Sequence, residues 1–257
     1  MRAAAGMCPE GLAVRGLERI ERVSDGVPDA ATVATRLATV RERIAAACAP
    51  AGRSAESIAI LAVTKGFGLE AIEAAFAIGL RDIGENYYQE ATGKFAGVRW
   101  PADSRRHFIG RLQRNKLRRI AERFDVVQTL QDLPQATALD RAASDAGKTL
   151  DVLIQINVAL DQRAGVAPHD APALAHELHG LGRLRLRGVM AVGPAERASR
   201  APAFARAATC FSAINREFPD ADLLSLGMSD DLEEAIAAGS NLVRLGTALF
   251  GPRPKEG

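Results

Sequence analysis

From residue 29 onward, short apolar runs alternate with longer segments of helical periodicity. The first segment, 29–49, places apolar residues at helical spacing and is closed by Pro50 and Gly52. The runs that follow predict strands at 58–63, 80–84, 106–110, 125–129, 151–157, 184–190, 222–226 and 241–245. Helical segments are predicted between them at 69–79, 86–96, 114–124, 132–147, 170–180, 198–217 and 230–239.

This order predicts an α/β protein with a single closed (β/α)₈ barrel of the TIM type over residues 29–257. Strands that alternate with helices pair in parallel through right-handed crossovers. The leading helix is expected to cover the place of the missing eighth connecting helix. An open doubly wound sheet is the alternative, but it usually carries a GxGxxG turn after its first strand, and here that turn reads VTKGFG.

Residues 1–28 differ in composition from the rest of the chain. They are rich in Ala, Gly and Arg and end in Pro28. We interpret them as a disordered or loosely packed N-terminal extension with one short helix at 17–23. Their sequence gives no indication of a function.

Composition and charge exclude several classes of protein. The net charge of +2 gives no general attraction to nucleic acid or to anionic membranes, and the three cysteines show no CxxC spacing. No apolar run reaches the length of a membrane-spanning helix, and the N-terminus carries no secretory signal. We therefore expect a cytoplasmic protein without disulfides, bound zinc, or a membrane or nucleic-acid partner.

Lys65 stands at the end of the first predicted strand, in the stretch IAILAVTKG. One interpretation is a lysine at the boundary of the core that extends its amine to water. The other is a reactive amine, because a lysine in a confined and partly desolvated site loses preference for the ammonium form and can attack an aldehyde. In a barrel of this kind, functional residues follow the C-terminal ends of strands, as Lys65 does.

A phosphate site is predicted after the seventh and eighth strands. Ser229 follows the stretch LSLGM, while Gly246 and Thr247 follow Arg244 in VRLGT. Loops at these two places commonly bind phosphate in TIM barrels, through backbone N–H groups and hydroxyls. The alternative is purely structural, with glycine for a turn and serine as a helix cap. If Arg244 faces inward, it requires a ligand or a carboxylate.

Other candidate motifs favour structural interpretations or stay open. Asn86 either caps the next helix or contacts a ligand in the barrel mouth, and His107 is expected to be a packed core histidine. The basic run 105–119 lacks interleaved aromatic residues and is interpreted as a solvated helix face. His176 and His179 share a helix face, but no third metal ligand accompanies them.

A reactive amine on one side of the mouth and a phosphate site on the other suit a phosphorylated aldehyde. Pyridoxal 5′-phosphate (PLP) is the obvious compound of this kind. The sequence also closely resembles the pyridoxal phosphate homeostasis (YggS/PROSC-type) proteins. The matching stretches are LAVTKG, IGENYYQEA, HFIGRLQRNK, VLIQINVALDQRAGV, LRGVMAV and LSLGMSDDLEEAIAAGSNLVRLGTALFG, which together span 61–251.

The resemblance implies a barrel like the N-terminal domain of alanine racemase, the fold-type III architecture of PLP proteins. It implies that PLP is bound covalently as an aldimine at Lys65, and that Arg244 faces the pyridine nitrogen. The cofactor-binding residues that it implies are Lys65, Asn86, Met190, Met228, Ser229, Arg244, Gly246 and Thr247.

The resemblance further implies a PLP carrier in vitamin B6 homeostasis without established catalysis. An arginine only donates hydrogen bonds and keeps the pyridine nitrogen unprotonated, so carbanion stabilisation is weak. Alanine racemases add a second domain whose tyrosine is the second base, and we expect no such domain here. We expect a monomer that holds PLP, with apo-enzymes as its recipients. The alternatives are a PLP-dependent amino-acid racemase of narrow activity and a Schiff-base aldolase that works without PLP.

Two departures from the family pattern bear on the site. The family usually has a Ser-Lys-Thr-Lys/Phe-Pro pattern after the first strand, where this chain has TKGFG at 64–68. The loop after the fifth strand usually carries a lysine where this chain has Arg163. Lys65 is intact, but a second lysine that could receive or relay PLP is missing from these two places.

Overall fold

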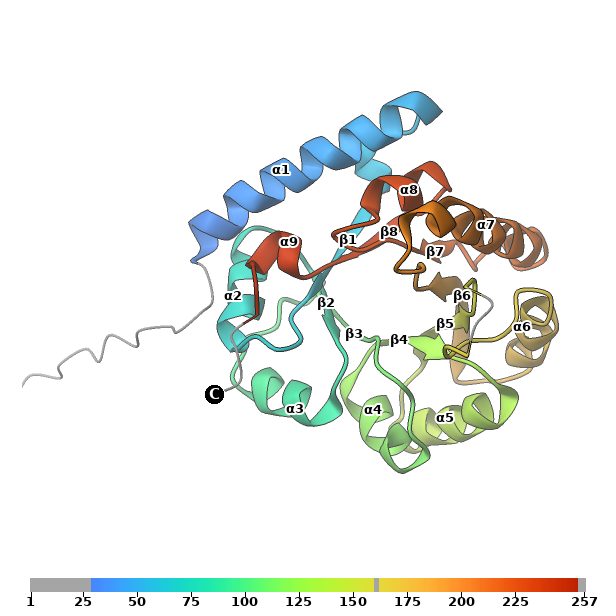
Figure 1. Ribbon diagram of the computed structural model, residues 1–257. Coiled ribbons are helices and arrows are strands. Elements are labelled where there is room, and N and C mark those ends of the chain that lie inside the picture. The colour runs from blue at the N-terminus through green and yellow to red at the C-terminus, as the bar shows by residue number, and fades with distance from the viewer. Residues whose placement is uncertain (1–28, 160–161, 254–257) are drawn as a thin grey trace, which may run out of the picture.

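The eight strands pair in their order along the chain and close into a parallel barrel (Figure 1). The computed structural model describes residues 29–159 and 162–253. The strands are β1 (Ala59–Val63), β2 (Asp82–Glu85), β3 (Arg105–Phe108), β4 (Val126–Leu130), β5 (Leu150–Ile156), β6 (Leu184–Ala191), β7 (Leu223–Ser225) and β8 (Leu242–Leu245). Their pairing confirms the predicted barrel, and the open-sheet alternative is wrong.

Helices connect the strands and surround the barrel, as parallel pairing requires. They are α2 (Leu69–Ala77), α3 (Tyr88–Ala96), α4 (Leu117–Arg123), α5 (Leu133–Asp145), α6 (Ala171–His179), α7 (Arg200–Glu217) and α8 (Leu232–Ala237). Short 3₁₀ turns stand at Ala49–Ala51, Ala55–Ser57, Arg114–Lys116 and Arg197–Ser199. The sequence did not predict the four-residue helix α9 (Thr247–Phe250) that follows β8.

The leading helix α1 (Ala30–Cys48) takes the place of a missing eighth connecting helix, as expected. The Asp29 carboxylate caps its first turn by accepting the backbone N–H of Thr32 at 2.7 Å. One face of α1 is buried, and the helix packs against α2, α8 and α9 (Figure 1). The predicted extension, 1–28, and its helix lie outside the described residues.

Apolar side chains fill two layers of the structure. The larger layer lies between the barrel and its helices. Inside the barrel, two small separate groups are formed by Leu61, Val63 and Leu242 and by Val126, Leu153 and Met190. Because side chains alternate along a strand, the residues two positions away from these also point into the barrel, and several of them are polar.

The N-terminal end of the barrel is closed by ion pairs. Asp151 is 3% exposed and pairs with three arginines, Arg105, Arg185 and Arg187. The predicted basic run, 105–119, therefore begins inside the barrel wall, since Arg105 and Arg106 lie on β3 and have carboxylate partners. Only its later part, in α4, presents a charged helix face to water.

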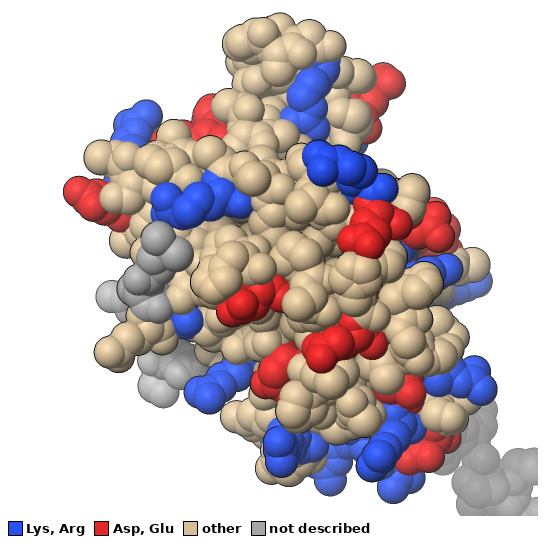
Figure 2. All heavy atoms as spheres, turned by 90° about the vertical axis from the view of Figure 1, so that its right-hand side faces the viewer, with Lys and Arg blue, Asp and Glu red and all other residues tan. Residues whose placement is uncertain are grey.

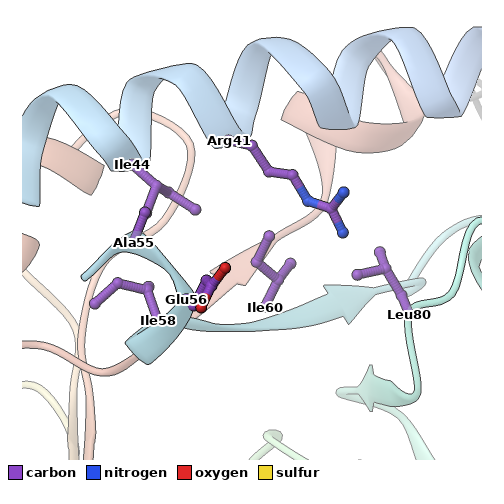
Figure 3. Close-up of a pocket in the computed structure, with 7 residues that line it drawn as sticks. All are labelled: Arg41, Ile44, Ala55, Glu56, Ile58, Ile60 and Leu80. Atoms are coloured by element: carbon purple, nitrogen blue, oxygen red, sulfur yellow. The ribbon is translucent and has the colours of Figure 1, made fainter.

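The outer surface has a hollow under α1. On the face that carries α6 and α7, side chains of one charge sign do not gather into a patch. The hollow has a volume of about 530 Å³, and Arg41 and Ile44 of α1 stand over Ile60 of β1 and over Leu80 (Figure 3). On the face of Figure 2, basic and acidic side chains are interspersed. Among the described residues, no helix is both long and apolar enough to cross a membrane.

Candidate functional site

A cavity of about 410 Å³ opens at the C-terminal end of the barrel. It is smaller than the hollow under α1, but more titratable and hydrogen-bonding side chains line it than line that hollow. All eight residues predicted from the sequence line it: Lys65, Asn86, Met190, Met228, Ser229, Arg244, Gly246 and Thr247. Five further residues complete the lining: Val63, Ile109, Val192, Asp230 and Arg253.

Lys65 is half-buried directly after β1. Burial lowers the pKa of its amine, and the positive charges of Arg253 and Arg244 lower it further. Glu85 and Glu90 act in the opposite direction but do not cancel this effect. The site therefore raises the fraction of neutral, nucleophilic amine above that of an ordinary lysine at the same pH.

A buried charge cluster behind the cavity holds the loop that carries Lys65. Lys94 of α3 donates to the backbone oxygens of Thr64 at 2.8 Å and Phe67 at 3.1 Å, and it pairs with Glu85 and Glu90. Glu90 also accepts the backbone N–H of Gly66 at 2.6 Å. Two carboxylates and one ammonium thus fix the backbone on both sides of Lys65.

Glu85 is part of this cluster and does not lie in the first turn of the next helix. It is the last residue of β2, is fully buried, and accepts a hydrogen bond from the Thr64 hydroxyl at 2.6 Å. Burial raises its pKa although the Lys94 ammonium acts to lower it. The sequence offered no signal for this pairing, because Lys94 is nine residues away on another element.

Asn86 faces the cavity and does not cap the next helix, which begins at Tyr88 with Tyr87 before it. Its amide oxygen is buried without a hydrogen-bond partner. Gly110 allows the chain after β3 to approach the backbone of Asn86, because a Cβ at that position would lie 1.9 Å from the Asn86 backbone oxygen. A buried orphan acceptor that borders a cavity indicates a polar ligand.

Hydroxyl and amide groups converge where β7 and β8 end. The Ser229 hydroxyl lies 3.1 Å from that of Thr247 and accepts the N–H of Ala248 at 3.2 Å. Arg43 of α1 holds this loop by donating to the Ser229 backbone oxygen at 3.0 Å while it pairs with Glu233. Two hydroxyls and backbone N–H groups at a helix start can bind an anion.

Arg244 is a buried cation at the base of the cavity. It is 5% exposed and donates to the backbone oxygens of Ser225 and Ala191 and to the Ser225 hydroxyl, at 2.7, 2.8 and 2.9 Å. Burial lowers its pKa to about 10, so it stays charged at neutral pH. Within 29–159 and 162–253, no carboxylate lies within ion-pair distance of it. The sequence predicted either a ligand or a carboxylate for an inward-facing Arg244, and backbone carbonyls take the place of the carboxylate.

Two methionines belong to the apolar part of the lining. Met190 is 2% exposed on β6, whereas Met228 is 38% exposed at the rim.

Arg253 was missed by the sequence reasoning, because it follows the last predicted strand and lies outside every motif. In the structure its stem crosses Gly66, with its Cδ 2.9 Å from where a Cβ of that glycine would be.

Among the described residues, no cluster of histidine, cysteine and acidic side chains could hold a metal ion. The two helical histidines are engaged elsewhere. His176 lies 3.0 Å from Glu217, and both His176 and His179 pack against Phe218.

Known proteins share this architecture. A profile of the family described as alanine racemase, N-terminal domain, matches residues 36–254. The pyridoxal phosphate homeostasis protein of Pseudomonas aeruginosa is 44% identical over 230 residues, which cover 86% of this chain and 96% of that one.

Solved structures agree with this. The PipY protein of Synechococcus elongatus, solved with PLP bound, is 33% identical with a TM-score of 0.74, over 85% of this chain and all of that one. Alanine racemase from Streptomyces coelicolor superposes with a TM-score of 0.71 at 21% identity, over 88% of this chain and 59% of that one. The last likeness concerns the fold alone.

Proposed function

Because this chain belongs to the pyridoxal phosphate homeostasis proteins and carries the alanine racemase N-terminal domain, we propose that it binds PLP at the barrel mouth. In this proposal it holds the cofactor through a Schiff base to Lys65 and takes part in controlling the supply of free PLP. PLP supplies an aldehyde that condenses with amines, a pyridine ring and a phosphate dianion. Each of these three parts has a suitable group in the cavity.

The side chains of the cavity fit such a ligand. Lys65 provides an amine whose lowered pKa favours attack on an aldehyde. Ser229 and Thr247, with the N–H groups that follow Gly246, offer neutral donors for a phosphate on the other side. Asn86 brings an unpartnered amide oxygen, and the two methionines, Met190 and Met228, provide apolar contact.

Arg244 carries the argument for a carrier rather than a strong catalyst. A guanidinium cannot accept a proton from the ring nitrogen, and its charge next to that nitrogen disfavours the pyridinium form. The described residues that line the cavity include no tyrosine or histidine, and the one carboxylate among them, Asp230, is exposed. A second base suited to amino-acid racemisation is therefore lacking in the described lining. We propose that the protein is not an enzyme.

The test is the reaction of purified protein with PLP. The wild-type protein should gain a visible band and, after borohydride reduction, a mass increase on the peptide that contains Lys65. Lys65→Ala should abolish both, whereas Lys116→Ala, a lysine outside the cavity, should leave both unchanged. A reduced adduct that persists in Lys65→Ala at the barrel mouth would overturn the assignment.

The proposal makes three further claims. Amino acids incubated with the loaded protein in deuterated solvent should exchange their α-protons no faster than with free PLP, and rapid exchange would establish a racemase-type enzyme instead. We also propose that the protein is a monomer, which light scattering should confirm. Apo-enzymes mixed with the loaded protein should recover activity faster than the spontaneous release of PLP allows.

A further inference from the structure

Polar side chains inside the barrel continue from Arg244 to the opposite end. The Ser225 hydroxyl, which accepts from Arg244, lies 2.8 Å from Oε1 of Gln128. Nε2 of Gln128 lies 3.0 Å from Nδ1 of His107, and Nε2 of His107 lies 2.8 Å from Oδ1 of Asp82. Five residues on β8, β7, β4, β3 and β2 thus form one connected chain.

The chain is buried and separates the two apolar groups of the barrel interior. Gln128 and Ser225 are fully buried, His107 is 1% exposed and Arg244 is 5% exposed. Only Asp82, the first residue of β2, reaches water, with 29% of its side chain exposed. Polar groups buried in this way must satisfy one another's hydrogen bonds.

The two ends of the chain fix the direction of every hydrogen bond in it. A guanidinium can only donate, so the Ser225 oxygen accepts from Arg244 and its proton is available to Oε1 of Gln128. The Gln128 amide must then donate from Nε2 to Nδ1 of His107. That nitrogen carries no proton, and the ring donates from Nε2 to the Asp82 carboxylate.

A chain whose donors all point the same way is polarised by the charges at its ends, which strengthens each bond in it. The carboxylate whose charge acts most directly on Arg244 is the buried Asp231, which raises its pKa against the effect of burial, whereas the carboxylate that ends the chain, Asp82, lies at the other end of the barrel. A carboxylate in direct contact would bind the guanidinium donors and neutralise the charge that faces the ligand.

We propose that Asp82, His107, Gln128 and Ser225 position Arg244 through this one-directional chain, with His107 held as the neutral Nε2–H tautomer. None of the first three touches the cavity, so they are positioning residues. The consequence for the cofactor rests on the proposed function, whereas the direction of the chain does not. The two parts are tested separately.

The direction is tested on the protein without PLP, by nitrogen NMR of the histidine rings. The chain contains four histidines, and the other three are exposed, so His107 is assigned by its loss in His107→Asn. Wild-type protein should show the Nε2–H tautomer, with Nδ1 unprotonated and hydrogen-bonded. An Nδ1–H tautomer or an imidazolium at His107 would overturn the proposal.

Gln128→Glu reverses one link and sharpens this test. A carboxylate can only accept, so it should draw a proton to Nδ1 and convert His107 to the imidazolium. A ring that stays in the Nε2–H tautomer next to an ionised Glu, identified by the chemical shift of its carboxyl carbon, would show that Gln128 does not set its state, and it would also overturn the proposal.

The positioning role is tested with Gln128→Met, which removes the amide at nearly constant volume. With Arg244 less fixed, the dissociation constant for PLP should rise about tenfold, the loss of one good hydrogen bond. A cation fixed beside the ring disfavours the protonated Schiff base. When this cation is less fixed, the pKa of the Schiff base should rise, and with it the pH at which the visible band of bound PLP converts to its near-ultraviolet form. Gln135→Met, the same exchange on α5 outside the barrel, should change neither quantity.

Three variants separate the possible failures. If Gln128→Met leaves affinity and spectrum unchanged while Arg244→Leu alters both, the positioning role is wrong and the proposed function stands. If Arg244→Leu and Lys65→Ala also behave as wild type, the proposed function itself fails. Should Gln128→Met not fold, Ser225→Ala removes the neighbouring link and must give the same shifts of affinity and spectrum.

Discussion

The ammonium of Lys94 lies 2.8 Å from the backbone oxygen of Thr64, the residue before Lys65, and 2.5 Å from the Glu85 carboxylate. One buried cation thus links the charge cluster to the reactive loop. Lys94→Met should lower the free energy of unfolding by about 3–5 kcal/mol, because it leaves a buried carboxylate without its partner. Denaturant unfolding at neutral pH measures this loss.

The same pair sets a pH dependence. Burial already raises the pKa of Glu85, and loss of Lys94 should raise it further. A protonated Glu85 stabilises the folded protein at low pH, and this stabilisation is lost as the pH rises through the raised pKa. The loss in free energy of unfolding caused by Lys94→Met should therefore be smaller under acid conditions. The double variant with Glu85→Gln should recover part of the stability at neutral pH. A deficit independent of pH would contradict this account.

Arg253 should accelerate PLP uptake through its charge. It lowers the pKa of Lys65, second only to burial, so Arg253→Ala should raise that pKa and reduce the fraction of neutral amine at a given pH. The profile of incorporation rate against pH should move to higher pH, measured by the growth of the visible band. Arg253→Lys keeps the charge and should keep the profile. An unchanged profile in Arg253→Ala would show that the charge has no effect on the amine.

Gly66 should be intolerant of a side chain for two separable reasons. Its φ of +74° favours glycine, and a Cβ would stand 2.9 Å from the Arg253 side chain. Gly147 has a similar φ of +65° with open space around it, so Gly147→Ala measures the backbone cost alone, about 1 kcal/mol. Gly66→Ala should cost more stability than that, because its Cβ meets the stem of Arg253 and not the flexible end, and it should also weaken PLP binding. In the double variant Gly66→Ala/Arg253→Ala, the part of these effects that comes from the contact with the Arg253 side chain should disappear.

The sequence predicted the barrel and the site residues that follow its strands from local signals, whereas the two methionines, Met190 and Met228, came from the family resemblance. Alternating apolar runs determine strands, and residues just after the strands must meet at one end of a parallel barrel. Lys65 after β1 and Ser229 after β7 could be placed at the same end of the barrel without any coordinates, and only β8 separates these two strands. Their positions follow from the order of the strands.

The groups that hold these residues in place were not predictable in the same way. Lys94 meets Glu85 only after α3 folds back, and His107 meets Gln128 and Asp82 across the interior of the barrel. Such pairs depend on which face of a strand or helix each side chain occupies, and on register between strands. His107 was correctly expected to be a core histidine, but its partners come from two other strands.

The anion site makes a prediction that distinguishes phosphate recognition from ring recognition. Ser229 brings its hydroxyl to Thr247 and to the N–H of Ala248, and these groups are proposed to contact only the phosphate. Ser229→Ala should raise the dissociation constant for PLP about tenfold to a hundredfold, since a hydrogen bond to a charged group contributes about 1.5–3 kcal/mol. Binding of pyridoxal, which lacks the phosphate, should be unchanged, as measured by absorbance titration of both ligands. Ser199→Ala, on a 3₁₀ turn outside the cavity, serves as the matched control. If Ser229→Ala weakened both ligands equally, the serine would act on the ring or the loop, and the phosphate would have to lie elsewhere in the mouth.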